Sequence, residues 1–151
     1  MNTFVPTIVV ITMIKRDVVV TLMRSGNVFT EQINAALQTE DLSIQQYNVL
    51  RILRGRKGVP ACLESITNDM IHRMSNTSRL VDKLIEKGYV ERKPCKENRR
   101  KVDIYITPKG LEVIERLEPT LLAKEDELTS SLSKQELEQL LYLVTKMKSK
   151  Y

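Results

Sequence analysis

A cluster of hydrogen-bonding side chains occupies one short stretch near the middle of the chain, where Ser75, Asn76, Ser78 and Arg79 stand together and Lys83 follows one helical turn later. An asparagine amide can pair with adenine, and an arginine guanidinium can bind guanine or a phosphate. Serine hydroxyls donate to phosphates, and the N-terminus of a helix itself attracts anions. Each residue also has a structural alternative, as a helix cap or as the partner of a nearby carboxylate. As a group they predict a helix that contacts nucleic acid.

A second group of basic residues lies in a predicted hairpin that follows this helix. Its members are Lys93, Lys96, Arg99, Arg100 and Lys101, with Asn98 among them. Residues 72–101 contain ten Lys or Arg and four Asp or Glu, a net charge of +6 in a chain whose total is +5. A basic excess concentrated in one segment is typical of a surface that binds a polyanion, and arginines at the end of a narrow ribbon can enter a minor groove. For the hairpin taken alone, a solvated charged turn without a partner stays open as the alternative.

The rest of the composition argues against several other classes of protein. One histidine, no glycine-rich phosphate loop and no metal-ligand spacing argue against an enzyme, so we predict no cofactor and no metal. Cys62 and Cys95 lie far apart, which argues against a disulfide framework and indicates a reducing, cytoplasmic location. Residues 3–14 are apolar but too few to span a bilayer, and they lack the pattern of a signal peptide. We therefore expect a soluble, folded protein with no membrane partner.

Hydrophobic periodicity predicts the elements that position these side chains. We expect helices at residues 14–38, from Ser43 to Gly55, at 61–70, from a Ser75 cap to Gly88, and from Pro108 and Ser133 onward, with strands at 89–93 and 102–107. The third and fourth helices are short and are joined by about four residues, which is typical of a helix-turn-helix. With the two strands that follow, they predict a mainly α (α+β) fold containing a winged helix-turn-helix. The first helix is apolar on more than one face, which indicates a subunit interface.

Several short motifs together resemble the MarR family of bacterial transcriptional regulators. They are found at residues 42–43 and 46–53, at 77–84 and 87–90, and at 98–100 and 106–110. The resemblance covers roughly residues 14–150. It implies a homodimer in which the first helix and the last two interlock. Residues 14–40 and 108–151 would then form the dimerisation helices and 41–107 the DNA-binding region. The apolar residues themselves mark 1–13 as an N-terminal extension, for which a misassigned start with Met13 as the true one, a short strand and an extension of the first helix all stay open.

The resemblance also implies a function and the residues that perform it. The protein would be a repressor, or less often an activator, that binds a pseudo-palindromic operator in double-stranded DNA. The expected contacts are Ser75, Asn76, Thr77, Ser78, Arg79 and Lys83 on the helix and Lys93, Lys96, Asn98, Arg99, Arg100 and Lys101 on the wing. The family's wing carries Asp-x-Arg, whereas this chain has Asn98 and Arg100. Many members of the family bind a small phenolic or anionic effector between the dimerisation helices and the DNA-binding region.

Two alternatives remain open at this level. Basic neighbours would lower the pKa of the Cys95 thiol and make it a redox site, although an exposed cysteine without a function is the simpler interpretation. A winged helix can also serve as a protein-interaction module that binds no DNA. The concentration of basic charge between residues 72 and 101 favours DNA, because a surface that only contacts protein has no need of it.

Overall fold

The structure is a computed structural model that describes residues 7–71, 76–95 and 102–149 of the chain, with side chains from residue 11 onward. The elements follow in the order α1 (Thr7–Leu37), the 3-10 helix η1 (Gln38–Glu40), α2 (Ile44–Gly55), α3 (Leu63–Asp69), α4 (Thr77–Glu86), β1 (Val90–Pro94), β2 (Val102–Ile106), α5 (Pro108–Thr129) and α6 (Lys134–Lys148). The predicted mainly α fold with a winged helix-turn-helix is confirmed.

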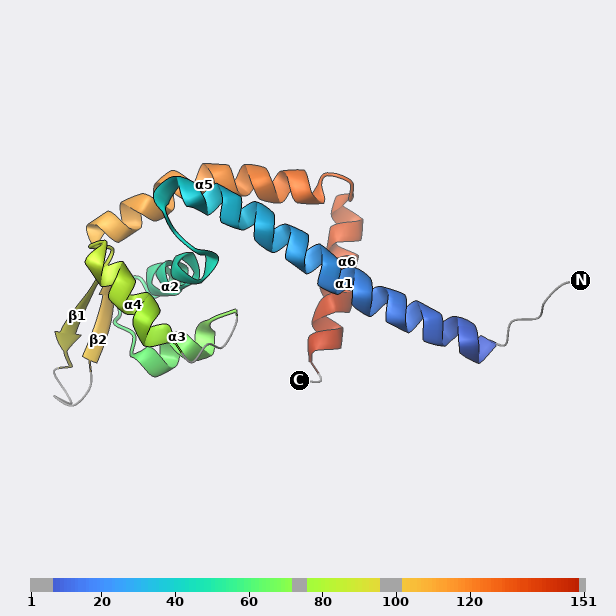
Figure 1. Ribbon diagram of the computed structural model, residues 1–151, viewed down its shortest axis with the longest axis horizontal. Helices are drawn as coiled ribbons and strands as arrows, with labels where there is room; N and C mark the ends of the chain where they lie inside the picture. Colours follow the sequence, from blue (N-terminus) through green and yellow to red (C-terminus); the bar gives the residue numbers. More distant parts are fainter. Residues whose placement is uncertain (1–6, 72–75, 96–101, 150–151) are drawn as a thin grey trace, which may run out of the picture.

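The winged lobe is built around one hydrophobic core. Helix α2 lies at its centre, where it contacts α3, α4 and α5, and the ribbon of β1 and β2 closes one end (Figure 1). The two strands are antiparallel, with Val90 opposite Ile106 and Pro94 opposite Val102. Ala61 adds a short bridge to Ile104, so the chain before α3 extends the ribbon by one residue pair. The ribbon is therefore attached to the segment that leads into α3 by this bridge as well as by the chain connections.

Local sequence signals start several of the helices where they were predicted. Ser43 opens α2 and Ser133 opens α6, each through a reciprocal capping box with the residue three positions later. Thr107 caps α5, and Pro108 occupies its first turn. These signals succeed because the hydrogen bonds that form them connect residues only three positions apart.

Several boundaries differ from the prediction. Helix α1 begins at Thr7 instead of residue 14, so most of the predicted N-terminal extension belongs to this helix. Helix α3 is shorter than residues 61–70, because Cys62 is its N-cap and Met70 leaves the helix in an extended conformation. Helix α4 takes Asn76 and not Ser75 as its N-cap.

Two helices extend away from the winged lobe. Helix α5 runs beside α1, and α6 and the N-terminal half of α1 lie at the end of the molecule opposite the ribbon (Figure 1). Large apolar side chains on α1 and α6 are exposed in the single chain. Within the described residues, no helix is long and apolar enough to cross a membrane.

Candidate nucleic-acid interface

The exposed face of α4 presents two cations that form no ion pair within the described part of the chain. The side chains of Ser78, Arg79 and Lys83 are exposed, while the other side of the helix is buried in the core. Among the described residues neither Arg79 nor Lys83 has an ion-pair partner, and the neighbouring carboxylate of Asp82 binds Arg92 instead. The ion pairs that formed the structural alternative for these cations are therefore absent from the described part of the chain. Their charge is available to an external anion.

The first residues of α4 face inward more than the sequence indicated. Ser75 lies outside the described residues, and the Asn76 side chain makes no capping hydrogen bond. The Asn76 Oδ1 atom is buried and has no hydrogen-bond partner in the described structure, so the carboxamide must turn before this oxygen can meet a base. Thr77 is only 4% exposed, and its hydroxyl oxygen lies 2.9 Å from Thr67 Oγ1. Thr77 is thus a packing residue between α3 and α4, and its predicted contact with DNA is not retained.

Arg92 joins the wing to α4, a role that the sequence analysis missed. Its Nη1 atom lies 2.6 Å from Asp82 Oδ1, and its Nη2 atom donates to Ser78 Oγ over 3.4 Å. The guanidinium is about three-tenths exposed and so is partly shielded from solvent. Strand alternation was the available signal, because Arg92 follows the buried Val90 by two positions and shares its face. Arg92 therefore sets the position of the ribbon relative to the exposed face of α4.

The described part of the wing holds one of its predicted cations in place. Lys93 lies 2.6 Å from Glu91 Oε1 and above the ring of Tyr105, with Nζ 5.1 Å from the ring centroid. The hydrogen bond to Glu91 raises the pKa of Lys93. The other predicted wing residues lie outside the described residues: Lys96, Asn98, Arg99, Arg100 and Lys101.

The two cysteines have different surroundings. Cys62 caps α3, where its sulfur accepts from the Ser65 backbone amide at 3.4 Å, and that hydrogen bond lowers the pKa of the thiol. Cys95 is a free, half-buried thiol at the end of β1, and its predicted redox role stays a prediction. Across the described ranges, no three His, Cys, Asp or Glu side chains are grouped so that they could hold a metal ion.

Ion pairs tie the corner after α1 to the winged lobe. Lys87, at the end of α4, donates to the Asp41 carboxylate over 2.6 Å. Arg116 of α5 binds both carboxylate oxygens of Glu40, at 2.9 and 3.0 Å. These hydrogen bonds lower the pKa of both carboxyl groups. The end of the long helix is thereby connected to the C-terminal end of α4.

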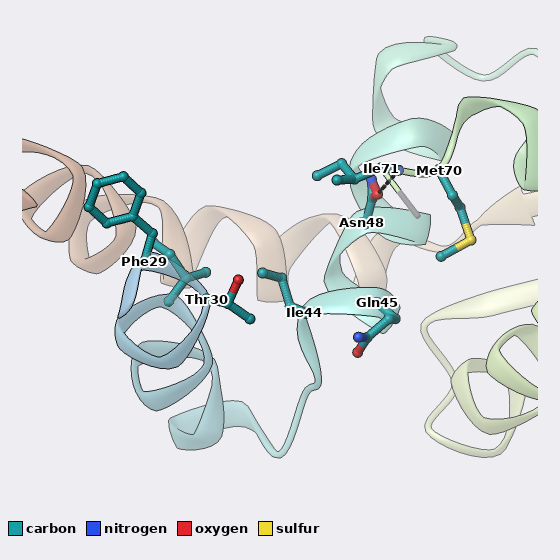
Figure 2. Close-up of a pocket in the computed structure, with 8 residues that line it drawn as sticks. Phe29, Thr30, Ile44, Gln45, Asn48, Met70 and Ile71 are labelled. Atoms are coloured by element: carbon teal, nitrogen blue, oxygen red, sulfur yellow. Dashed lines mark hydrogen bonds between the residues drawn. The ribbon is translucent and has the colours of Figure 1, made fainter. Parts of the chain in front are cut away.

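A cavity of about 240 Å³ lies between α1, α2 and the end of α3 (Figure 2). Its lining residues come from α1, α2 and the end of α3: Phe29, Thr30, Ile33, Ile44, Gln45, Asn48, Met70 and Ile71. A smaller cavity of about 160 Å³ shares four of these residues and adds Tyr47, Arg51, Leu121 and Glu125. The larger cavity is mostly apolar, and none of its lining side chains is charged.

Known proteins resemble this chain in both sequence and fold. The MarR family model matches residues 42–102. The HTH-type transcriptional regulator PecS of Dickeya dadantii is 30% identical over 122 residues, which cover 79% of this chain and 72% of PecS. A mutant MarR from E. coli complexed with operator DNA matches with a TM-score of 0.77 at 23% identity, over 84% of this chain and 90% of that one. Bordetella bronchiseptica BpsR, whose DNA binding is regulated by 6-hydroxynicotinic acid, matches with a TM-score of 0.77 at 20% identity, over 85% and 90%.

Proposed function

The chain belongs to the MarR family of transcriptional regulators, and from that premise we propose that it acts as a homodimeric repressor on a pseudo-palindromic operator and is released by a small-molecule effector. The observation that carries the proposal is the exposed face of α4, where Arg79 and Lys83 have no ion-pair partner among the described residues. Such a regulator works in the cytoplasm, where its DNA lies. Catalysis has no part in this proposal.

Contact with DNA would use α4 and the wing together. Helix α4 enters the major groove, with its N-terminal residues at the base edges, as the second helix of a helix-turn-helix does. Arg79 and Lys83 bind phosphates or guanine, and Asn76 turns to read a base. Arg92 holds the ribbon beside this helix through its contacts with Asp82 and Ser78, so the wing reaches the flanking groove at a set distance. The proposed contacts are Ser75, Asn76, Ser78, Arg79, Lys83, Lys93, Lys96, Asn98, Arg99, Arg100 and Lys101.

A second copy of the chain would cover the apolar surface of α1 and α6. No residue of α6 is buried in the single chain. Exposed apolar area of this extent is unfavourable in water and marks an interface. It would be buried symmetrically in a twofold dimer. The exposed apolar side chains are Ile11, Met13, Ile14, Val18, Val19, Val20, Leu22, Met23, Val28 and Phe29 on α1 and Leu140, Leu141, Tyr142, Leu143, Val144 and Met147 on α6.

The cavity beside α1 is the proposed effector site. It lies between a helix of the dimerisation region and the helix-turn-helix, so a ligand there contacts both parts of the chain. The similar fold of BpsR, whose DNA binding is regulated by 6-hydroxynicotinic acid, supports the same class of regulation. The neighbouring cavity contains Arg51 beside Tyr47, where burial raises the pKa of the phenol. A phenolic or anionic effector would place its polar group toward this second cavity.

Selection of bound duplexes from a random DNA pool, followed by footprinting, tests the proposal. We expect an enriched sequence with two half-sites in opposite orientation, whose centres lie about one helical turn or a multiple of it apart. A chain with both Arg79→Glu and Lys83→Glu should enrich nothing. A charge reversal at Lys134, whose side chain is 90% exposed and which lies before the apolar run of α6, should recover the original site. Absence of any enriched sequence for the unmodified chain would refute DNA recognition, and a single unpaired half-site would refute the dimer.

A further inference from the structure

Asn48 connects the cavity to the chain that leads into the recognition helix. Its side chain lines both cavities, and its Oδ1 atom accepts a hydrogen bond of 3.0 Å from the backbone N–H of Ile71 (Figure 2). Ile71 follows Met70, where the chain has left α3 in an extended conformation, so its N–H has no helical acceptor. The side chain of a cavity residue therefore supplies the hydrogen bond that the backbone lacks.

Met70 makes a second connection between the cavity and α4. Its side chain lines the cavity and is 6% exposed. Its sulfur accepts from the hydroxyl of Thr77, the first residue of α4, at 3.8 Å. Thr77 is itself buried and contacts Thr67 of α3. One wall of the cavity and the first turn of the recognition helix thus belong to the same packed group.

We propose that Asn48 is a positioning residue for the recognition helix, α4. A ligand in the cavity acts by replacing the Ile71 N–H as the hydrogen-bond donor to Asn48 Oδ1 and by displacing Met70 from Thr77. This inference rests on the proposed function, because it describes how an effector would change DNA binding. It also concerns the free protein, in which the hydrogen bond between Asn48 and Ile71 is present without DNA. The side-chain carboxamide of Asn48 holds the start of α4 in its DNA-binding position when the cavity is empty.

The lining of the cavity defines the class of ligand that can do this. A ligand must offer an O–H or N–H donor to replace the Ile71 amide at Asn48 Oδ1. Its body must be apolar, because Phe29, Ile33 and Ile44 form much of the wall. A volume of about 240 Å³ exceeds the roughly 150 Å³ of an apolar cavity that binds benzene. The site therefore takes a one-ring aromatic compound that carries a hydrogen-bond donor.

Hydrogen exchange on the free protein tests the connection without a ligand or DNA. Asn48→Ala removes the acceptor, and loss of one hydrogen bond should speed exchange at the Ile71 amide by about twofold to tenfold. Exchange at Leu80, whose N–H makes the first backbone hydrogen bond of α4 with Asn76, should also rise. Asn48→Asp keeps an acceptor oxygen and should restore both amides. Unchanged exchange at Ile71 or Leu80 in Asn48→Ala would overturn the proposal, and so would a uniform rise through the whole chain, because Asn48 would then support the fold in general.

Filling the cavity tests the effect of a ligand without knowing its identity. Thr30 lines the cavity from α1 and is exposed, so Thr30→Trp adds an aromatic ring there without removing a core side chain. We expect faster exchange at Ile71 and at least tenfold weaker binding to the DNA recovered from the random pool. Glu31→Trp is the matched control, because Glu31 is exposed and does not line the cavity, and it should change neither. Unchanged exchange and DNA affinity in Thr30→Trp would overturn the proposal. If the unmodified chain bound no DNA, the proposed function would fail while the exchange experiments still decided the role of Asn48.

Discussion

Gly110 is the position where a single added methyl group should disturb the base of the wing most. A Cβ atom at Gly110 would lie 2.2 Å from the backbone oxygen of Tyr89 and 2.8 Å from Ile106 Cγ1. The same Tyr89 oxygen accepts the backbone N–H of Thr107, so it cannot move without weakening the junction between the ribbon and α5. Gly110 is also buried, which leaves no solvent-facing route for the helix to shift. The side chain of any other residue therefore forces α5 away from Tyr89 and from Ile106 of β2.

The expected cost follows from two opposing terms. Overpacking of this severity costs about 3 kcal/mol, and replacement of a helical glycine by alanine returns about 1 kcal/mol. Gly110→Ala should therefore lower the free energy of unfolding by about 2 kcal/mol, and the melting temperature by roughly 4–8 °C for a chain of this size. Gly55→Ala is the matched control, because a Cβ atom there meets nothing within 4 Å. It should raise stability by up to about 1 kcal/mol.

Urea unfolding followed by circular dichroism measures both variants. All samples need one protein concentration, since the stability of a dimer depends on it. A Gly110→Ala chain as stable as the unmodified one would refute the steric argument, because the close approach of α5 to the Tyr89 carbonyl would then be easily relieved. Equal loss of stability in Gly55→Ala would refute it as well, since the effect would not depend on space at the glycine.

Three further predictions concern the interface, the acid limb of stability and base reading. Leu141→Glu, at a side chain 70% exposed in the single chain, should yield monomers in sedimentation velocity, whereas Gln139→Glu should leave the dimer intact. Arg116 holds the pKa of Glu40 below its ordinary value of 4.5, so this contribution to stability is present above about pH 4.5 and is lost as the pH falls through the folded-state pKa. Glu40→Gln should therefore lessen the loss of stability in acid. An unchanged fall in the free energy of unfolding below about pH 4.5 would contradict that. Asn76→Ala should change the base preferred at one position of each half-site, and a uniform loss of affinity for all sequences would show that another residue reads that base.

The features that the sequence predicted well are those encoded by neighbouring residues. Ser43 and Ser133 define helix starts because each cap is completed three residues later. Strand pairing was predicted because Val102, Ile104 and Ile106 alternate with polar residues. The start of α1 was predicted too late because β-branched residues have low helix propensity, and the long helix that follows them overrides that preference.

The features that the sequence did not predict depend on contacts between distant residues. Thr77 was predicted to contact DNA, and only the packing of α4 on Thr67 shows that it is buried. Arg92 binds residues 10 and 14 positions earlier in the chain, on an element of another type. Asn48 accepts from a backbone amide 23 positions later, which no local pattern indicates. Such contacts become visible only when the helices are placed against one another.

The salt dependence of binding to duplex DNA tests most directly whether the exposed face of α4 is the DNA-binding surface. Each phosphate contact contributes about 0.9 to the slope of log K against log salt, and two cations in each of two subunits correspond to about 3.6. We predict a steep slope for the unmodified chain and one smaller by roughly that amount when Arg79 and Lys83 are both changed to Ala. Lys134→Ala, at a lysine that is 90% exposed and lies before the apolar run of α6, should leave the slope as it was. No binding by the unmodified chain at low salt, or an equal slope for the Arg79 and Lys83 variant, would contradict the account.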